Sequence, residues 1–166
     1  MTVLHSKRVF IHGLESSSQG TKGLFFQQRY PGMIVEDYPG TFKERMEKLE
    51  RLLLGKTGLI LVGSSYGGLM AAIYACLRED NVEKLILLAP AIHLDEFDPC
   101  LDRSVLVPTV IIHGANDDVV PPEPVLRRAE RVFPDLQYHL LKDDHSLHEN
   151  FPFLDWDRLL EIRRNP

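Results

Sequence analysis

The sequence contains little cysteine: its 166 residues include only Cys76 and Cys100, which lie far apart along the chain. Redox dithiol motifs and cysteine-based zinc sites need closely spaced cysteines, and no C-x-x-C is present. The histidines show no metal-ligand spacing with a carboxylate either. We therefore expect neither a metal nor a cofactor. Cys76 lies in an apolar stretch and is expected to be a small core residue.

Long hydrophobic runs and clusters of positive charge are also missing. No apolar run approaches the roughly 20 residues that span a bilayer, and no apolar segment of signal-peptide type precedes Val9. The formal net charge is -5, and no stripe of lysine and arginine offers a surface for phosphate backbones. These absences predict a cytoplasmic protein that spans no membrane and binds no nucleic acid.

The chain does have a regular alternation of short apolar runs and helical patterns. Its length and its 44% apolar and 26% charged composition are typical of one soluble domain, here residues 1–166. Several runs lack in-and-out alternation, which is typical of strands covered on both faces of a parallel sheet. The pattern predicts an α/β fold, a three-layer α/β/α sandwich with about six mostly parallel strands. The six runs are residues 9–12, 33–37, 59–62, 84–88, 109–113 and 137–141.

The segments between these runs carry helical signals. Thr41 and Glu44 have the spacing of a capping box, and Gly55 follows the apolar repeat behind them, so a helix is expected in between. Pro124 is placed for the first turn of another helix. A last helix is predicted over about residues 153–164.

The most informative motif is G-x-S-x-G at residues 63–67, between the apolar run 59–62 and a helical pattern. In this motif the serine lies on a sharp turn from strand to helix, which exposes its hydroxyl above the sheet. Gly63 and Gly67 lack a Cβ atom and therefore tolerate close contact with neighbouring backbone. Ser65 is thus the candidate nucleophile.

Two downstream loops contain the partners that a serine nucleophile needs. A base must activate the hydroxyl, and a third group must orient the base. In open α/β sheets these groups come from loops at the carboxyl ends of strands. One such loop contains Asp117, and the next contains His145. The order Ser65, Asp117, His145 is the order that the elbow motif requires, so we predict these three as the catalytic residues.

With these motifs the chain resembles the α/β-hydrolase superfamily, specifically its small lidless bacterial serine esterases. The resemblance covers nearly the whole chain and includes H-G-L at residues 12–14, H-G-x-x-D-x-x-V-P at 113–121 and D-H-S-L at 144–147. It implies a sheet without the first two strands of the family, because the H-G loop normally follows the third strand. It also implies that the backbone N–H groups of Leu14 and Tyr66 form the oxyanion hole.

Three other carboxylates compete with Asp117 for the role of the acid. Asp118 is one residue along and is expected to point elsewhere, since an adjacent residue in a loop normally faces another way. Asp95 and Asp98 follow the fourth run, a position from which some relatives supply their acid. The sequence leaves this choice open.

Other histidines compete with His145 as the base. His148 lies in the same loop, whereas His139 falls inside a predicted strand, where a structural role is commoner. His12 and His113 each end a strand ahead of a glycine, and we expect them to shape the loops by hydrogen bonding.

The walls of the substrate pocket are predicted from the segment between the fourth and fifth runs. Only residues 91–108 separate these runs, where larger relatives insert a helical lid. Without a lid the pocket is expected to be shallow and open. Leu94, Phe97 and Leu101 are the candidate substrate-binding wall residues, and small or loosely held acyl groups are the expected substrates.

These observations predict a serine esterase that cleaves a small-molecule acyl ester through an acyl-enzyme. A thioesterase, a C–C bond hydrolase or a cofactor-free peroxidase would use the same three residues. A non-catalytic binding module on the same fold is a further alternative, although such a module has no need of Ser65, Asp117 and His145 together. A monomer and a homodimer are both compatible with the sequence.

Overall fold

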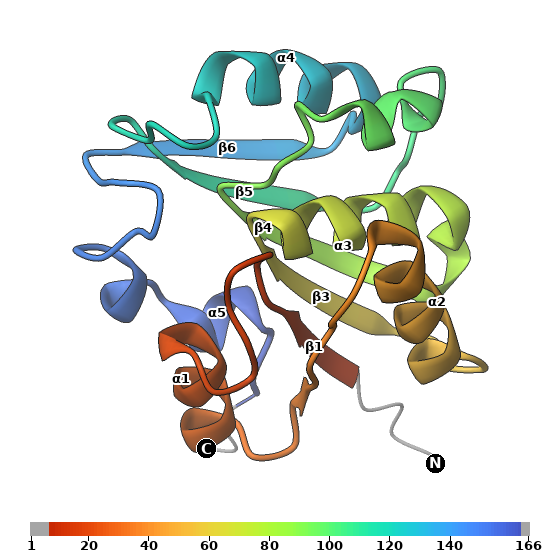
Figure 1. Cartoon of the computed structure of the whole chain (residues 1–166), viewed down its shortest axis with the longest axis vertical. Helices are drawn as coiled ribbons and strands as arrows, with labels where there is room; N and C mark the ends of the chain where they lie inside the picture. Colours follow the sequence, from red (N-terminus) through yellow and green to blue (C-terminus); the bar gives the residue numbers. More distant parts are fainter. Residues whose placement is uncertain (1–6, 164–166) are drawn as a thin grey trace.

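The computed structural model describes residues 7–163. They contain a six-stranded sheet in which each strand pairs in parallel with its neighbours, in the order β2-β1-β3-β4-β5-β6 (Figure 1). Each predicted run overlaps an observed strand, although β2 is short and lies at the edge of the sheet. The strands are β1 Lys7–Ile11, β2 Ile34–Val35, β3 Leu59–Ser64, β4 Val82–Leu88, β5 Thr109–Gly114 and β6 Leu136–Leu141.

Helices connect these strands, and α2 begins where the sequence signal places it. The predicted capping box is present, because Thr41 Oγ1 accepts a hydrogen bond from Glu44 N–H and Glu44 Oε2 accepts one from Thr41 N–H. Among the helices of residues 7–163, none combines the length and apolar character that a membrane span needs. The α-helices are α1 Thr21–Arg29, α2 Phe42–Leu53, α3 Tyr66–Leu77, α4 Pro122–Val132 and α5 Trp156–Leu159, and the 3-10 helices are η1 Glu79–Asn81, η2 Asp95–Cys100 and η3 Phe151–Phe153.

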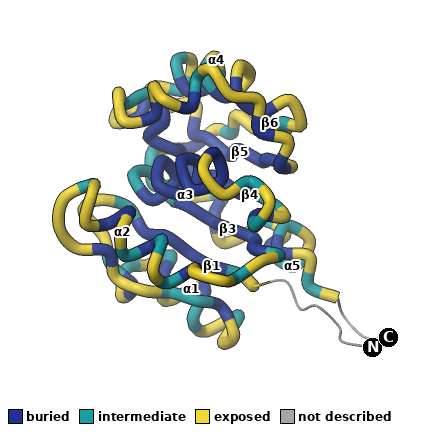
Figure 2. Tube along the Cα trace, turned by 90° about the vertical axis from the view of Figure 1, so that its right-hand side faces the viewer, coloured by how far each residue is buried: buried dark blue, intermediate teal, exposed yellow. Residues whose placement is uncertain are grey.

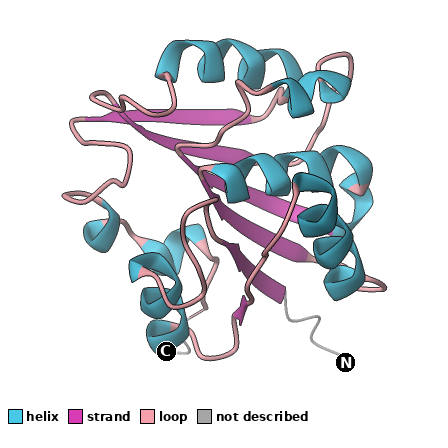
Figure 3. Ribbon diagram, in the orientation of Figure 1, coloured by secondary structure: helices cyan, strands magenta, loops and turns pink. Residues whose placement is uncertain are grey.

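The inner strands send alternate side chains into two apolar layers, because successive residues of a strand face opposite sides of the sheet. Leu59 and Leu61 of β3 pack in one layer with α2, α3 and α4, whereas Ile60 and Val62 pack in the other with α1 and α5. The same alternation is found in β1, β4 and β5. Helices therefore cover both faces of the sheet, as Figure 3 shows, and the predicted three-layer α/β/α sandwich is confirmed.

Helix α3 is buried around its whole circumference, and Figure 2 shows it in dark blue between the sheet and the outer helices. Every residue from 67 to 76 is buried, including Cys76, which is the core residue that was predicted. Gly67, Gly68 and several alanines let the helix lie close to the sheet. This packing fixes the beginning of α3 directly above the end of β3, where Ser65 lies.

The last part of the described chain differs from the prediction of a helix over about residues 153–164. Only the four residues of α5 are α-helical, and Phe153 ends the 3-10 helix η3. The side chain of Asp155 accepts a hydrogen bond from Arg158 N–H and so sets the start of the helix, while Glu161 has a φ of 53° and turns the chain out of it. Residue 164 of the predicted helix lies outside the described residues.

Candidate active site

Ser65 lies on the turn that joins β3 to α3. Its backbone has φ 55° and ψ -113°, a conformation that residues with side chains seldom adopt. The motif glycines make the turn sterically possible. A Cβ atom on Gly63 would lie 2.4 Å from Gly67 O, and one on Gly67 would lie 2.1 Å from Ile11 O. The strand–turn–helix geometry predicted for G-x-S-x-G is therefore present.

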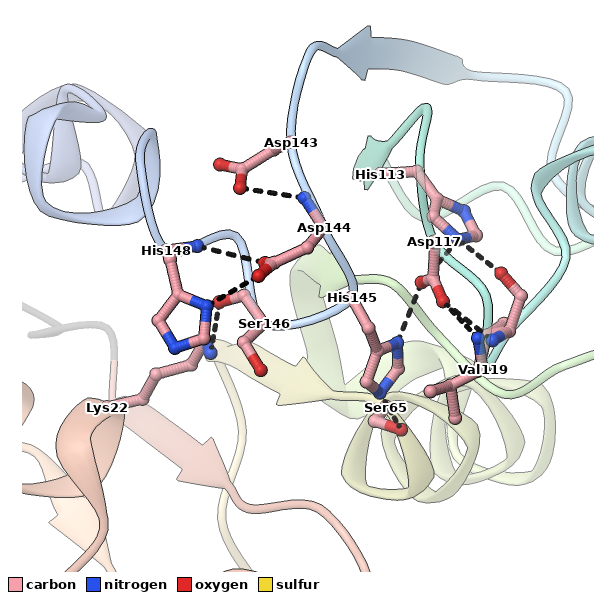
Figure 4. Close-up of polar contacts among 11 residues, drawn as sticks. Lys22, Ser65, His113, Asp117, Val119, Asp143, Asp144, His145, Ser146 and His148 are labelled. Atoms are coloured by element: carbon pink, nitrogen blue, oxygen red, sulfur yellow. Dashed lines mark hydrogen bonds and ion pairs between the residues drawn. The ribbon is translucent and has the colours of Figure 1, made fainter.

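Three side chains form a continuous hydrogen-bonded series at this turn (Figure 4). His145 Nε2 lies 3.1 Å from Ser65 Oγ, and His145 Nδ1 lies 2.7 Å from Asp117 Oδ2. Asp117 follows β5 and His145 follows β6, so both come from loops after neighbouring strands. Because Nδ1–H donates to the carboxylate, the unprotonated Nε2 faces the serine hydroxyl. The ring is thus placed to take the proton of Ser65.

The Asp117 carboxylate is buried, and both of its oxygens accept hydrogen bonds. Its Oδ1 accepts from the N–H groups of Val119 at 2.9 Å and Val120 at 2.7 Å, while Oδ2 accepts from His145 and from His113. Burial alone would raise the pKa of Asp117, but the hydrogen bonds from His145, Val120 and Val119 outweigh it and hold the pKa below its ordinary value. Asp117 is therefore ionised at neutral pH.

His113 lies behind Asp117, on the side away from His145 (Figure 4). Its Nε2 lies 3.1 Å from Asp117 Oδ2 and 3.0 Å from Val120 O, and because both oxygens are acceptors, Nε2 carries the proton. Burial lowers the pKa of His113, and its Nδ1 has no partner within residues 7–163. His113 is thus a neutral donor that holds the Asp117 loop, in line with the predicted loop-shaping role.

The loop that carries His145 is organised by a second buried carboxylate. Asp143 accepts hydrogen bonds from the backbone N–H of Asp144 and from the backbone and side chain of Asn150. Burial would raise the pKa of Asp143, but these bonds together lower it. Gly114 lets this loop approach β5, since a Cβ atom there would lie 2.3 Å from Asp144 O. The sequence analysis did not single out Asp143, although its place directly before the D-H-S-L turn was a signal.

Lys22 of α1 supports the same loop from another side. Its Nζ donates a hydrogen bond to Ser146 O at 2.7 Å and lies 5.2 Å from the centre of the Phe151 ring. Burial lowers the pKa of Lys22, and the negative charges of Asp144 and Asp143 act against that shift. Nothing in the sequence pattern indicated that Lys22, more than 120 positions away, reaches this loop.

The competing carboxylates lie away from His145. Asp118 and Asp95 are exposed. Asp98 accepts a hydrogen bond from Arg128 Nη1 at 2.7 Å on the surface. Of the carboxylates considered in the sequence, Asp117 is thus the one that the structure brings to His145.

The competing histidines also lie away from the Ser65 hydroxyl. His148 is exposed, and its Nδ1 lies 2.6 Å from Asp144 Oδ2, a bond that lowers the pKa of Asp144 to about 2. His139 is exposed on β6, where it lines a hollow of about 580 Å³ together with residues of β5 and α5. None of the residues that line this hollow lines the cavity beside Ser65.

Two backbone N–H groups beside Ser65, those of Leu14 and Tyr66, are left without a hydrogen-bond partner in the described part of the chain. Tyr66 is the first residue of α3, and Leu14 lies in the loop after β1. That loop lies against the serine, because a Cβ atom on Gly13 would be 3.5 Å from Ser65 Cβ. These are the two groups that the resemblance to the family implied.

His12 fixes the orientation of the loop after β1. Its Nδ1 donates to Gly13 O at 2.7 Å, and its Nε2 accepts from Tyr38 N–H at 2.9 Å. In a trans peptide the C=O of Gly13 and the N–H of Leu14 point in opposite directions. By holding the Gly13 carbonyl, His12 therefore determines where the Leu14 N–H points.

A cavity of about 660 Å³ opens beside Ser65. Its walls include His145, Leu14 and Tyr66, and also Leu94, one of the three predicted wall residues. Its other apolar lining comes from residues such as Val119, Phe151 and Pro152. Within residues 7–163, no three His, Cys, Asp or Glu side chains are grouped in a way that could hold a metal ion.

Phe97 and Leu101 do not line this cavity, so their prediction as wall residues is wrong. Phe97 is 0% exposed, and its ring centre lies 6.4 Å from that of Phe133 in the core. Leu101 packs against the same core. The cause is η2, which turns the apolar side chains of this segment inward toward α3 and α4, and the sequence did not indicate which way that segment turns.

Several solved structures are similar to the chain. Est1E from Butyrivibrio proteoclasticus is 15% identical, with 95% of this chain and 87% of that chain covered and a TM-score of 0.74. A monoacylglycerol lipase from Paleococcus ferrophilus is 17% identical, with 93% of both chains covered and a TM-score of 0.72. The alpha/beta hydrolase domain-containing protein 10 from mouse is 20% identical, with 84% of this chain and 82% of that chain covered and a TM-score of 0.72. At these identities the likeness shows the fold alone.

The sequence itself matches a family profile. No curated protein matches the chain by sequence. The profile described as alpha/beta hydrolase fold, however, matches residues 13–102, which is more than half of the 166 residues and includes both the loop after β1 and the Ser65 turn. The chain therefore belongs to the alpha/beta hydrolase fold family.

Proposed function

We propose that the protein is a serine hydrolase that cleaves carboxylic esters with small acyl groups through an acyl-enzyme. One observation carries the proposal: His145 Nε2 lies 3.1 Å from Ser65 Oγ while His145 Nδ1 lies 2.7 Å from Asp117 Oδ2. A serine hydroxyl is a weak nucleophile at neutral pH, and it needs such a base, itself oriented by a third group. Membership of a hydrolase fold family supports the reaction class.

In the acylation step, Ser65 Oγ attacks the carbonyl carbon of the ester while His145 Nε2 takes the hydroxyl proton. The ionised Asp117 keeps Nδ1 protonated and stabilises the imidazolium that forms. The imidazolium then gives its proton to the alcohol oxygen as the C–O bond breaks. The alcohol leaves, and the acyl group stays on Ser65.

Negative charge develops on the carbonyl oxygen in both tetrahedral intermediates. The N–H groups of Leu14 and Tyr66 would bind this oxyanion, each such donor contributing roughly 3–4 kcal/mol in related enzymes. Tyr66 also begins α3, and the amino-terminal end of a helix favours negative charge.

Deacylation reverses the roles with water in place of the alcohol. His145 Nε2 takes a proton from the water as its oxygen attacks the acyl carbonyl. The tetrahedral intermediate then collapses, His145 returns the proton to Ser65 Oγ, and the carboxylic acid leaves. Every proton that is taken in one step is returned in another, so the protein ends unchanged.

We infer that the substrates carry a small or loosely held acyl group. The cavity has a volume of about 660 Å³, and Leu94 and Val119 line it together with Ser65. The segment between β4 and β5 packs η2 onto the core, and its residues before η2, such as Leu94, line the cavity. The lipase among the similar structures is named for an ester substrate, which agrees with ester hydrolysis.

The test replaces Ser65 with alanine and measures hydrolysis of a short-chain nitrophenyl ester together with labelling by a fluorophosphonate. We expect the parent to be labelled and active and Ser65→Ala to lose both properties. The matched control is Ser104→Ala, at an exposed position, which should keep both. Activity of Ser65→Ala within tenfold of the parent would contradict the assignment of the nucleophile.

A further inference from the structure

Arg45 of α2 is a buried arginine close to the Ser65 turn, and it has no role in the proton transfers described above. It is only 6% exposed. Its Nε donates to Gly40 O at 3.0 Å and its Nη2 donates to Leu14 O at 3.3 Å. Its guanidinium carbon also lies 5.5 Å from the centre of the Tyr66 ring. Arg45 thus contacts both residues whose N–H groups face the oxyanion position.

The charge of Arg45 has no carboxylate partner among the residues that the structure describes. None of the ion pairs found within residues 7–163 includes it, and its Nη1 has no hydrogen-bond partner in that part of the chain. Arginine keeps its charge in proteins, and burying a charge without a partner is strongly unfavourable. Carbonyl oxygens and a ring face therefore compensate this charge only in part.

A nearby negative charge would compensate the positive charge of Arg45. The oxyanion of the tetrahedral intermediate is such a charge. Leu14 O lies 3.3 Å from Nη2, and the N and O atoms of one residue are roughly 3 Å apart. The oxyanion would lie about 3 Å beyond that N–H. The guanidinium and the oxyanion are therefore within about 10 Å of each other.

We propose that Arg45 is a positioning residue for the oxyanion hole, which holds the Leu14 carbonyl and Tyr66 in place and supplies a fixed positive charge that the tetrahedral intermediate compensates. The inference rests on the proposed esterase function. A preorganised charge of this kind stabilises the transition state more than the bound ester, because the ester carbonyl carries little charge. Arg45 should therefore affect kcat and leave KM almost unchanged.

The expected size follows from Coulomb's law. At a separation of 8–10 Å and an effective dielectric constant of about 20, loss of the charge should lower kcat roughly tenfold to thirtyfold. Neutral variants should show this loss, whereas Arg45→Lys should keep most of the activity because it keeps the charge on a flexible side chain.

The experiment compares Arg45→Gln, Arg45→Met and Arg45→Lys in the full chain. Arg51→Gln, which removes a charge from an exposed position of the same helix, is the matched control. For each variant, thermal unfolding is measured first, then kcat and KM with a nitrophenyl ester, then the affinity of a boronic acid, whose adduct with a serine carries a tetrahedral anion. Arg45→Lys keeps the comparison informative if a neutral variant does not fold.

We expect Arg45→Gln to lose kcat and boronic-acid affinity by the same tenfold to thirtyfold, with KM within threefold, and Arg45→Lys and Arg51→Gln to stay within threefold of the parent. If Arg45→Lys is impaired as much as Arg45→Gln, the charge of Arg45 does not contribute to kcat, and the electrostatic role that the inference requires is absent. If Arg45→Gln keeps its kcat within threefold, Arg45 has only a structural role. Either result overturns the inference. A parent protein that neither turns over esters nor is labelled at Ser65 contradicts the esterase proposal itself, so the two failures are distinguishable.

Discussion

The two sides of Ser65 are built differently. On one side, His145 and Asp117 are titratable side chains from two loops, joined by hydrogen bonds of 3.1 Å and 2.7 Å (Figure 4). On the other side, Leu14 and Tyr66 contribute backbone N–H groups, whose positions depend on peptide geometry and on places where only glycine fits. The first side depends on charge and protonation, and the second depends on steric fit.

This difference predicts two kinds of vulnerability. Replacing a carboxylate by an amide changes hydrogen-bond donors and acceptors with almost no change in volume, so it should disturb the His145 side alone. Adding a methyl group at a glycine changes volume without changing charge. It should therefore disturb the packing of α3 against β1, which positions the N–H groups of Leu14 and Tyr66. The following substitutions test this separation in order of expected effect.

Asp117→Asn should have the largest effect on activity. The amide NH₂ cannot accept the proton of His145 Nδ1, so the ring would turn or change tautomer and present N–H to the Ser65 hydroxyl. We expect kcat to fall roughly 10³–10⁴-fold, as in related triads. Steady-state hydrolysis of a nitrophenyl ester measures the change.

Asp118→Asn is the matched control, because Asp118 is the exposed neighbour in the same loop. It should keep kcat within twofold of the parent. An Asp118→Asn variant that loses more activity than Asp117→Asn would show that the wrong carboxylate has been assigned as the acid.

Gly67→Ala should have the largest effect on the steric side. The added Cβ would lie 2.1 Å from Ile11 O and 2.5 Å from His12 O, both in backbone that has little room to move. We expect the free energy of unfolding to fall by about 3 kcal/mol, with activity lost as the Ser65 turn is displaced. Urea unfolding at neutral pH measures the stability.

The control for this substitution is Gly32→Ala, because a Cβ atom at Gly32 meets nothing within 4 Å. Its free energy of unfolding should stay within about 0.5 kcal/mol of the parent. Equal stability of the two alanine variants would mean that the contact of Gly67 with β1 does not constrain the turn.

Sequence patterns predicted the fold well because they report on local burial and turn chemistry. The apolar runs contain the strand residues that are covered on both faces, such as Ile60 and Leu61, and the capping box at Thr41 is a local interaction. The last helix was predicted too long because helical periodicity does not reveal a left-handed residue such as Glu161, whose φ of 53° ends α5.

At the site, sequence motifs predicted those residues whose backbone geometry is fixed by residues close to them in the sequence. Ser65 is fixed by glycines two positions away on either side. Phe97 was misplaced because an apolar residue in a loop gives no sign of whether it faces a cavity or the core. The contacts of Lys22 and Arg45 were not predictable either, since each depends on a pairing between distant segments that only the folded chain brings together.

The smallest effect is expected from Asp143→Asn. This substitution tests whether the stability of the His145 side depends on pH. The Asp143 carboxylate is buried and accepts hydrogen bonds from Asp144 N–H and from Asn150, and these lower its pKa below the ordinary 3.8. Loss of the charged acceptor should reduce the free energy of unfolding by about 2 kcal/mol at pH 7. It should also reduce kcat several-fold, because the His145 loop is loosened.

The sign of the pH dependence follows from the direction of the shift. A carboxyl group whose pKa is lowered by folding stabilises the protein above its unfolded pKa, and this contribution is lost as the pH falls through the lowered value. Urea unfolding from pH 7 down to pH 3 should therefore show the parent losing more stability below about pH 4 than Asp143→Asn does. Glu149→Gln, at the exposed neighbour in the same loop, should follow the parent curve. If the Asp143→Asn and parent curves stay parallel, protonation of Asp143 does not loosen this loop, and the acid sensitivity of the His145 side must come from other carboxylates, such as Asp117 and Asp144.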